Sequence, residues 1–221
     1  MIKLVVWDWN GTLFDDAQAV LKAANASEVP MLGLPPVTLE QMRDSYEVPI
    51  IKAYENLGVD PEVFKAKSAE ISPMFHRAYE PLAATGRTRP GTRQALETLK
   101  KNHITSIILS NHTMEGIYFQ LTRLKLMSYF GGVLANDDST TAHHTGKQHR
   151  LETYLEKNHY QPHDVVIVGD TPEEVKIARA LGIHVISVSG GMCSRRRLVV
   201  AKPDHLISSV KEIITTLEDI A

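Results

Sequence analysis

The segment Ile2–Thr12, with the sequence IKLVVWDWNGT, decides the fold of this chain. Its first part, Ile2–Trp7, is a short apolar run interrupted by a single lysine. Such a run is typical of a strand that is buried on both faces of a parallel sheet. The run ends at Asp8, and Gly11 then turns the chain. Because ligands bind at the carboxyl ends of strands in open α/β sheets, Asp8 is a candidate site residue. The alternative is that Asp8 only caps the turn.

The composition is that of an ordinary globular protein. The chain has 221 residues, of which 43% are hydrophobic and 23% are charged, so it can form one core with or without a modest insertion. A net charge of -2 and the lack of a long apolar stretch argue against nucleic acid and membranes as partners. The single cysteine, Cys193, excludes an intrachain disulfide and favours a cytoplasmic location. We expect Cys193 to be structural.

A helical block separates the first strand from the rest of the chain. From about Asp16 to Thr85, apolar residues recur at helical spacing and no segment has the pattern of a strand. Thr38 is a predicted capping residue, and Asp60 followed by Pro61 is a strong signal for the start of a helix. The expected helices are residues 17–29, 39–48, 50–57 and 61–79.

Strands and helices alternate from about Pro90 to the end of the chain, which predicts a parallel sheet with right-handed crossovers. The carboxyl ends of its strands share one edge, so the residues that end three of them, Asp8, Ser110 and Asp170, are expected to lie together. Convergent polar groups of this kind indicate a site. The expected strands are residues 2–7, 106–111, 131–135, 165–170, 184–190 and 204–207, and the expected helices are residues 92–102, 114–126, 147–158 and 173–182, with a last helix from 208.

Four short motifs occur in order across nearly the whole chain. They are Asp8-Trp9-Asn10-Gly11-Thr12, Ser110-Asn111, Gly146-Lys147-Gln148 and Gly169-Asp170-Thr171-Pro172-Glu173-Glu174. In their order, spacing and placement after expected strands, they resemble the motifs of the haloacid dehalogenase-like hydrolases. Within that family, the chain is most similar to the phosphoglycolate phosphatase-like members.

The resemblance implies a fold, a division into domains and an activity. We expect an α/β protein with a Rossmann-like parallel-sheet core, residues 1–15 and 86–221, and an inserted all-helical cap, residues 16–85. The implied activity is Mg²⁺-dependent hydrolysis of a small phosphorylated metabolite by a monomer or homodimer. The cap is expected to close over the site, exclude water and select the substrate.

The acidic residues of the motifs are suited to bind a metal. Two carboxylates, Asp8 and Asp170, and the backbone carbonyl of Asn10 form an oxygen-rich set of the kind that Mg²⁺ prefers. The resemblance also implies that Asp8 attacks phosphorus and forms an aspartyl-phosphate. Glu174 lies one helical turn after Asp170, where the family more often has aspartate. It either acts on the metal through water or lies on the helix surface.

The remaining motif residues are expected to contact the phosphoryl group. Ser110, Lys147 and nearby backbone N–H groups are predicted to hold its oxygens, because fixed donors supply much of the stabilisation in phosphoryl transfer. Taken alone, Lys147 is an ordinary surface lysine, and only its place in the motif order favours the site. Gly11, Thr12 and Asn111 are predicted to bind the substrate.

Asn10 is the main departure from the family. Phosphatases of the family have aspartate there, which protonates the leaving group, and general acid–base catalysis contributes roughly 10²–10⁴-fold in rate. Three interpretations stay open: a slow phosphatase or one for good leaving groups, a phosphatase with another proton donor, or a protein that binds phosphate compounds without turnover. The candidate donors are His112, His143, His144 and His149.

Phosphonate hydrolysis is a further alternative, because such enzymes use a cap lysine in place of the second aspartate. Lys22 and Lys52 lie in the expected cap, but the sequence places neither at the position of that lysine. A receiver domain, which also carries a phosphorylated aspartate, is a weaker alternative because the chain is too long for a single receiver.

Other conspicuous residues have simpler interpretations. Trp7 and Trp9 flank Asp8 and are expected to pack in the core on the opposite face of the strand. The run Arg195–Arg197 is predicted to form a solvated face, with an anionic partner as the alternative. The histidines 143, 144 and 149 are interpreted as solvated loop residues, with metal binding or proton transfer as the alternative. Arg43, Arg77 and Arg87 are candidates to reach the substrate from the cap or hinge.

Overall fold

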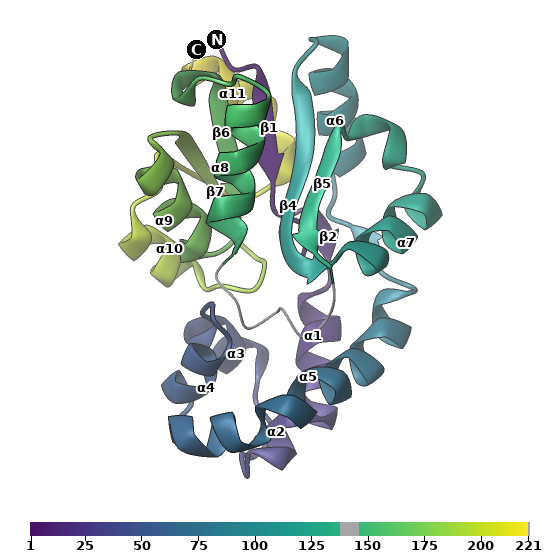
Figure 1. The fold of residues 1–221 in the computed structure, drawn as a ribbon, viewed down its shortest axis with the longest axis vertical. Helices are drawn as coiled ribbons and strands as arrows, with labels where there is room; N and C mark the ends of the chain where they lie inside the picture. Colours follow the sequence, from purple (N-terminus) through teal and green to yellow (C-terminus); the bar gives the residue numbers. More distant parts are fainter. Residues whose placement is uncertain (138–145, 221) are drawn as a thin grey trace.

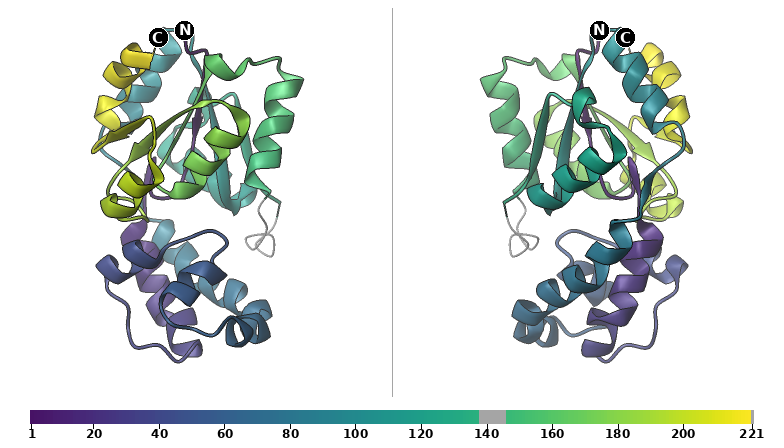
Figure 2. Two further views of the ribbon diagram at one scale, coloured as in Figure 1. Left: turned by 90° about the vertical axis from the view of Figure 1, so that its left-hand side faces the viewer. Right: turned by 90° about the vertical axis from the view of Figure 1, so that its right-hand side faces the viewer.

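The computed structural model describes residues 1–137 and 146–220 of the chain. These residues form a parallel sheet with helices on both faces, and a separate group of helices lies beyond one end of the strands (Figure 1). Both termini lie at the end of the core that is farthest from this helical group (Figure 2). Within the described ranges, we find no helix with the length and apolarity needed to span a membrane.

The sheet has six strands in the order β5-β4-β1-β6-β7-β8, and all neighbouring strands are parallel. In its middle lies β1 (Leu4–Trp7), where Trp7 pairs with Ile108 on one side and with Val168 on the other. The predicted α/β fold is confirmed, and the carboxyl ends of the strands point toward the helical group (Figure 1). The other strands are β4 (Thr105–Thr113), β5 (Gly132–Asn136), β6 (Val165–Gly169), β7 (His184–Val188) and β8 (His205–Ile207).

Alternate residues of β1 point into two separate hydrophobic layers, as the period of a strand requires. Val5 and Trp7 pack with α6 (Thr92–Lys101), α7 (Met114–Leu124) and α11 (Ile213–Ile220) on one face. On the other face, Leu4 and Val6 pack with α8 (Lys147–Lys157) and α9 (Pro172–Leu181). Burial on both faces explains why the strand is a nearly unbroken apolar run.

The helical group has a small hydrophobic core of its own, in which Tyr54 and Phe64 stack with ring centroids 5.5 Å apart. A two-stranded antiparallel pair, β2 (Phe14–Asp15) with β3 (Arg87–Thr88), forms where the chain enters and leaves the group. This pair was not predicted from the sequence. The helices are α1 (Ala17–Ala26), α2 (Glu28–Met31), α3 (Leu39–Ser45), α4 (Ile51–Asn56) and α5 (Pro61–Ala83).

Several element boundaries differ from the predictions. The first predicted helix is divided at Ser27 into α1 and α2, and α5 continues four residues beyond its predicted end at Tyr79. The helix α10 (Arg195–Ala201), which Ser194 caps, was not predicted. The last helix begins later than predicted because a 3₁₀ turn over Val210–Glu212 precedes it. Two further 3₁₀ turns are Met127–Tyr129 and Pro162–Asp164.

Both tryptophans pack in the core, as predicted. Trp7 and Trp9 are fully buried in the layer that α6, α7 and α11 cover. The ring of Trp9 stacks on Phe14, with 5.5 Å between the ring centroids, and its Nε1 donates to Gln120. The chain on both sides of Asp8 is therefore fixed by packing, which holds the Asp8 backbone in place at the end of β1.

Candidate active site between the sheet edge and the helical group

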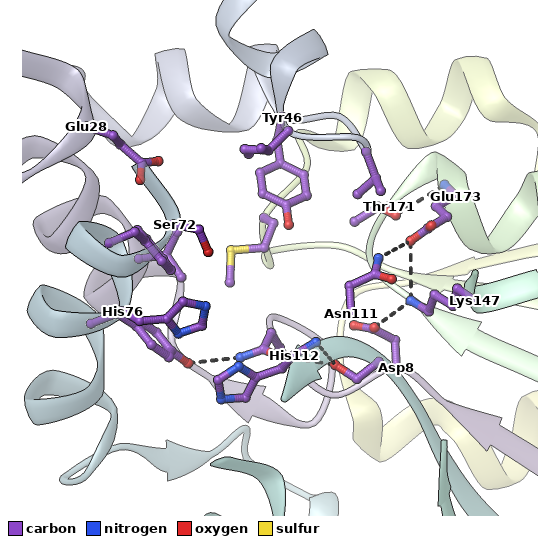
Figure 3. Close-up of a pocket in the computed structure, with 18 of the residues that line it drawn as sticks. Asp8, Glu28, Tyr46, Ser72, His76, Asn111, His112, Lys147, Thr171 and Glu173 are labelled. Atoms are coloured by element: carbon purple, nitrogen blue, oxygen red, sulfur yellow. Dashed lines mark hydrogen bonds and ion pairs between the residues drawn. The ribbon is translucent and has the colours of Figure 1, made fainter. Parts of the chain in front are cut away.

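A pocket lies between the carboxyl edge of the sheet and the helical group (Figure 3). The cavity volume is about 180 Å³, and the lining comes from both parts of the chain. Residues of the core that line it are Asp8, Asn10, Ser110, Asn111, His112, Lys147, Thr171, Glu173, Glu174 and Met192. Residues of the helical group that line it are Val20, Glu28, Tyr46, Val48, Ile50, Ile71, Ser72, Phe75, His76 and Tyr79.

Lys147 lies at the centre of the polar end of this pocket. It begins α8, and its side chain is only 2% exposed, so it is not the surface lysine that the isolated residue suggested. Its Nζ donates to Asp8 Oδ1 over 2.8 Å and to Glu174 Oε1 over 2.5 Å, and lies 3.5 Å from Glu173 Oε2. Burial alone would lower the pKa of Lys147, but the Asp8 and Glu174 carboxylates hold it well above its usual value. The side chain is a fixed cation beside Asp8.

Asp8 and Asp170 share the hydroxyl of Thr12. Its Oγ1 lies 3.1 Å from Asp8 Oδ2 and 2.7 Å from Asp170 Oδ1, so the predicted motif residues do converge. The backbone N–H of Met192 donates to Asp170 Oδ2 over 2.5 Å. Gly11 adopts a φ of 77°, and a Cβ atom there would collide with the Asp170 carboxylate. Glycine is therefore required for the close approach of the first turn to Asp170.

This end of the pocket has a deficit of positive charge. Burial raises the pKa of the Asp8 carboxyl well above its usual range, although Lys147 opposes the effect. Burial and the nearby Glu174 raise the pKa of Asp170 to about 6. Among the described residues, one ammonium group, that of Lys147, lies here with four carboxylates: Asp8, Asp170, Glu173 and Glu174. Such a cluster suits a divalent cation with oxygen ligands, so the residues fit Mg²⁺.

Glu174 is fully buried and is not the helix-surface residue that one interpretation allowed. Its Oε2 accepts from the backbone N–H and the hydroxyl of Thr171, over 3.1 and 2.7 Å, in a capping box at the start of α9. Its Oε1 binds Lys147. Since both oxygens have partners in the protein, the clearest role of Glu174 in this geometry is to orient the lysine.

Glu173 is a site residue that the sequence analysis quoted within a motif but did not assign. Its Oε2 accepts from Asn111 Nδ2 over 2.8 Å, and burial raises the pKa of Glu173. Asn111 was predicted to bind substrate, and it does line the pocket while holding Glu173. Both Glu173 and Glu174 line the pocket, and helical periodicity alone did not predict this.

Asn10 connects the first motif to the helical group. Its Nδ2 donates to Asp16 Oδ2 over 2.7 Å and to the Tyr79 hydroxyl over 2.9 Å, and that hydroxyl donates to the same Asp16 oxygen over 2.6 Å. Burial raises the pKa of Asp16 to about 6. Ser110 Oγ lies 3.5 Å from Asn10 Oδ1. The Asn10 amide can therefore donate to both the Asp16 carboxylate and the Tyr79 phenol. Through these two contacts it links α1 and α5 to the end of β1.

The end of β4 presents Ser110 and His112 to the pocket. Ser110 Oγ accepts from the backbone N–H of His112 over 3.1 Å, and Arg150 donates to the Ser110 carbonyl over 3.0 Å. Arg150 also donates to Asn136 Oδ1, and Asn136 Nδ2 donates to the carbonyl of Asn111. These contacts fix the strand two residues beyond its predicted end.

His112, Glu80 and His76 form a cluster where the core meets α5. Glu80 Oε1 lies 3.2 Å from His76 Nδ1 and 3.8 Å from His112 Nε2, and the two imidazole rings are parallel, with centroids 5.9 Å apart. The mixed nitrogen and oxygen donors differ from the oxygen set that Mg²⁺ prefers. Burial lowers the pKa of His112 to about 4, so His112 is neutral near pH 7 and holds no acidic proton for a leaving group.

Most of the other candidate basic residues lie outside the pocket lining. His149 is exposed on α8, and His143 and His144 lie outside the described residues. Arg43 donates to the carbonyls of Gly190 and Gly191, while Arg77 and Arg87 are exposed. Lys22 and Lys52 are exposed too, so the phosphonate-hydrolase alternative lacks its lysine among the described residues.

The interpretation of Arg195–Arg197 as a solvated face is wrong for one of the three residues. Arg195 and Arg196 are exposed, but Arg197 is partly buried. Its Nη2 donates to Glu47 over 3.0 Å, and its Nη1 donates to the carbonyl of Tyr46. Arg197 therefore ties α10 of the core to the segment that carries Tyr46, a pocket residue. The contact spans 150 residues, which is why no local pattern indicated it.

Comparisons with known proteins agree with this geometry. The family model of the haloacid dehalogenase-like hydrolases matches residues 5–188. Curated phosphoglycolate phosphatases of Nitrosospira multiformis and Synechococcus elongatus are 27% and 26% identical to the chain. The alignments cover 96% of this chain in both cases, and 93% and 96% of the relatives.

Solved structures share the fold. A haloacid dehalogenase-like hydrolase of Streptococcus pneumoniae superimposes with a TM-score of 0.80 at 19% identity, covering 98% of both chains. A haloacid dehalogenase-like protein of unknown function from Agrobacterium tumefaciens gives a TM-score of 0.76 at 19% identity, covering 100% of this chain and 99% of the other. With the family model matched over most of the sheet and the four motifs gathered at its edge, the chain belongs to the haloacid dehalogenase-like hydrolases.

Proposed function

We propose that the protein hydrolyses phosphate monoesters of small molecules, with Asp8 as the nucleophile. The observation that carries this proposal is the position of Asp8: a carboxylate at the end of β1, 2.8 Å from a buried ammonium group, open to a pocket that two parts of the chain enclose. A nucleophilic carboxylate needs a neighbouring cation to meet an anionic substrate, and Lys147 supplies one. The relatives named as phosphoglycolate phosphatases support a small phosphorylated substrate.

We propose Mg²⁺ as the cofactor, held by Asp8, Asp170 and the backbone carbonyl of Asn10. When bound, the ion neutralises charge on the phosphoryl group as it meets Asp8. The excess of carboxylate over ammonium groups at this end of the pocket supports a cation there. We propose that Glu174, a candidate ligand, acts on the metal through water and orients Lys147, which its Oε1 contacts.

In the proposed mechanism, Asp8 attacks phosphorus and the bond to the leaving oxygen breaks. Lys147 and the Ser110 hydroxyl hold the phosphoryl oxygens, while Thr12 fixes the Asp8 carboxylate and Asn111 fixes Glu173. Water then cleaves the aspartyl-phosphate and returns Asp8 to its initial state. The helical group covers the pocket and excludes water from the first step.

The side chain of Asn10 decides which leaving groups depart readily. Its amide donates to Asp16 and Tyr79 and has no exchangeable acidic proton for the leaving oxygen. Loss of general acid catalysis costs roughly 10²–10⁴-fold for leaving groups that need a proton. We therefore propose that esters of acidic alcohols or phenols are the better substrates.

The second candidate function is binding of phosphate compounds without turnover, and the engagement of Asn10 by Asp16 favours it. Steady-state hydrolysis of phenyl phosphate in the presence of Mg²⁺ separates the two. We expect hydrolysis by the wild type and at least a 10³-fold loss in Asp8→Asn. Asp60→Asn is the matched control, because Asp60 caps α5 on the surface and asparagine also caps helices. Binding of phosphate without any hydrolysis would contradict the proposal. A cytoplasmic location and a monomeric or homodimeric state remain predictions.

A further inference from the structure

The pocket has two chemically different ends. Asp8 and Lys147 lie at one end, whereas Glu28, Ser72 and His76 lie across the cavity on the helical group (Figure 3). The helical group and the loop after Gly190 also supply apolar lining residues beside Tyr46: Val20, Val48, Ile50, Ile71, Phe75 and Met192. If the phosphoryl group occupies the Asp8 end, the leaving group lies against these walls.

The described part of this leaving-group region offers no arginine or lysine. Lys147, the lysine of the lining, is committed to Asp8 and Glu174 at the other end. The carboxyl group in the region, Glu28, is 5% exposed and accepts a hydrogen bond from the Tyr54 hydroxyl. The candidate arginines Arg43, Arg77 and Arg87 lie outside the lining. Arg43 donates to the carbonyls of Gly190 and Gly191.

A carboxylated leaving group fits this region poorly. A buried carboxylate needs a cation or several hydrogen-bond donors, since an unpaired buried charge is strongly disfavoured. Here the described lining offers a second carboxyl group, Glu28, and the polar side chains of Ser72, His76 and Tyr46, but no lysine or arginine other than Lys147. Two relatives are named phosphoglycolate phosphatases, and the leaving group of phosphoglycolate carries a carboxylate, so we expect that ester to fit this pocket poorly.

The size of the cavity favours a small leaving group. Its volume is about 180 Å³. An apolar cavity of about 150 Å³ in another protein holds benzene. Because the phosphoryl group also needs room, the space that remains suits a short alkyl chain or a single small ring.

Resting on the phosphatase function proposed above, we propose that the natural substrate is the phosphate ester of a small, uncharged and largely apolar phenol or acidic alcohol. A phosphorylated hydroxy acid such as phosphoglycolate is then a poor substrate. Val48 and its apolar neighbours select the leaving group by contact, and Glu28 rejects carboxylates.

Binding of alkylphosphonates tests this inference separately from catalysis, because hydrolysis of monoesters does not cleave a P–C bond. Calorimetric titrations in Mg²⁺ would compare methyl-, ethyl- and propylphosphonate with 2-carboxyethylphosphonate, which matches the propyl compound in length. Each buried methylene is worth roughly fourfold in affinity, so we expect propylphosphonate, with two more methylenes, to bind about 15-fold more tightly than methylphosphonate. We expect the carboxyethyl compound to bind at least tenfold more weakly than the propyl compound.

Two variants assign the selectivity to the pocket. At about pH 8, above the pKa of Glu28, Glu28→Gln removes a negative charge and is expected to narrow the difference in affinity between the propyl and carboxyethyl compounds. Glu40→Gln, on the exposed surface of α3, is the matched control and is expected to leave the gap unchanged. Val48→Thr keeps the shape of the side chain and is expected to weaken the binding of propylphosphonate more than that of methylphosphonate. Folding of each variant is checked by circular dichroism.

The outcomes distinguish this inference from the proposed function. Equal or tighter binding of 2-carboxyethylphosphonate would overturn the inference even if phenyl phosphate is hydrolysed. An affinity for propylphosphonate no higher than that for methylphosphonate would overturn the inference as well. The expected order of affinities, found in a protein that hydrolyses no monoester, would support the ligand chemistry and contradict the phosphatase function.

Discussion

Replacing Asn10 by aspartate creates a pair of buried carboxyl groups, and the structure predicts its effect on stability. Asn10 Nδ2 lies 2.7 Å from Asp16 Oδ2, and in Asn10→Asp an oxygen takes the place of that nitrogen. Two full charges at that separation repel by about 6 kcal/mol at an effective dielectric constant of about 20. The pair avoids this repulsion by keeping one proton.

The cost of keeping the proton depends on pH. Burial already raises the pKa of Asp16 to about 6, and a second carboxylate beside it raises the pKa of the pair further. Holding a proton costs about 1.4 kcal/mol for each pH unit above the pKa, which gives at most about 3 kcal/mol at pH 8. Protonation is therefore cheaper than repulsion. Because the folded variant binds a proton that the unfolded chain releases, its stability falls as the pH rises.

Urea unfolding in the absence of divalent metal measures this effect. Relative to wild type at the same pH, we expect Asn10→Asp to lose about 3 kcal/mol at about pH 8 and less than about 1 kcal/mol at about pH 5.5. Asn102→Asp, on the exposed end of α6, is the matched control and should show no such difference. Equal losses at both pH values would refute the reasoning, because they would show that Asp16 does not share a proton with the new carboxyl group.

Three further predictions follow from other contacts. Lys147→Met should lower kcat/KM for phenyl phosphate by at least about 100-fold, because the fixed cation beside Asp8 is lost. Burial raises the pKa of Glu28 to about 7, so the stability lost as the pH rises from about 4.5 to about 7 should be about 3 kcal/mol larger in the wild type than in Glu28→Gln; urea unfolding across that range checks this. Arg197→Ala should cost about 1 kcal/mol in urea unfolding because the contacts with Glu47 and Tyr46 are lost, whereas Arg196→Ala, a matched change at an exposed position, should be nearly neutral.

The core was predictable because its signals are local. The apolar runs of β1 and β6 are buried on both faces, and each ends at an aspartate. Parallel pairing then forces Asp8 and Asp170 to the same edge, where Thr12 bridges them. The order of the motifs along the chain was enough to bring these residues together, since each follows a strand.

What the sequence did not reveal depends on contacts between distant residues. Asn10 meets Tyr79, 69 residues away, and Arg197 meets Glu47, 150 residues away; neither pairing has a local pattern. The pair β2–β3 is two residues long on each side, too short for its alternation to be recognised. The chemistry of the leaving-group region likewise comes from residues scattered through the helical group, such as Val20 and Ile71, which become neighbours only in the folded chain.

The most direct test of Asp8 as the nucleophile is to look for the phosphoryl group on Asp8 itself. The wild type is mixed with phenyl phosphate and Mg²⁺, quenched in acid within milliseconds, digested and analysed by mass spectrometry. If Asp8 is the nucleophile, we expect a phosphorylated peptide that contains Asp8, sensitive to hydroxylamine as an acyl phosphate is, and absent from Asp8→Asn. Phenol release without any phosphorylated Asp8, or with the group on another residue, would contradict it.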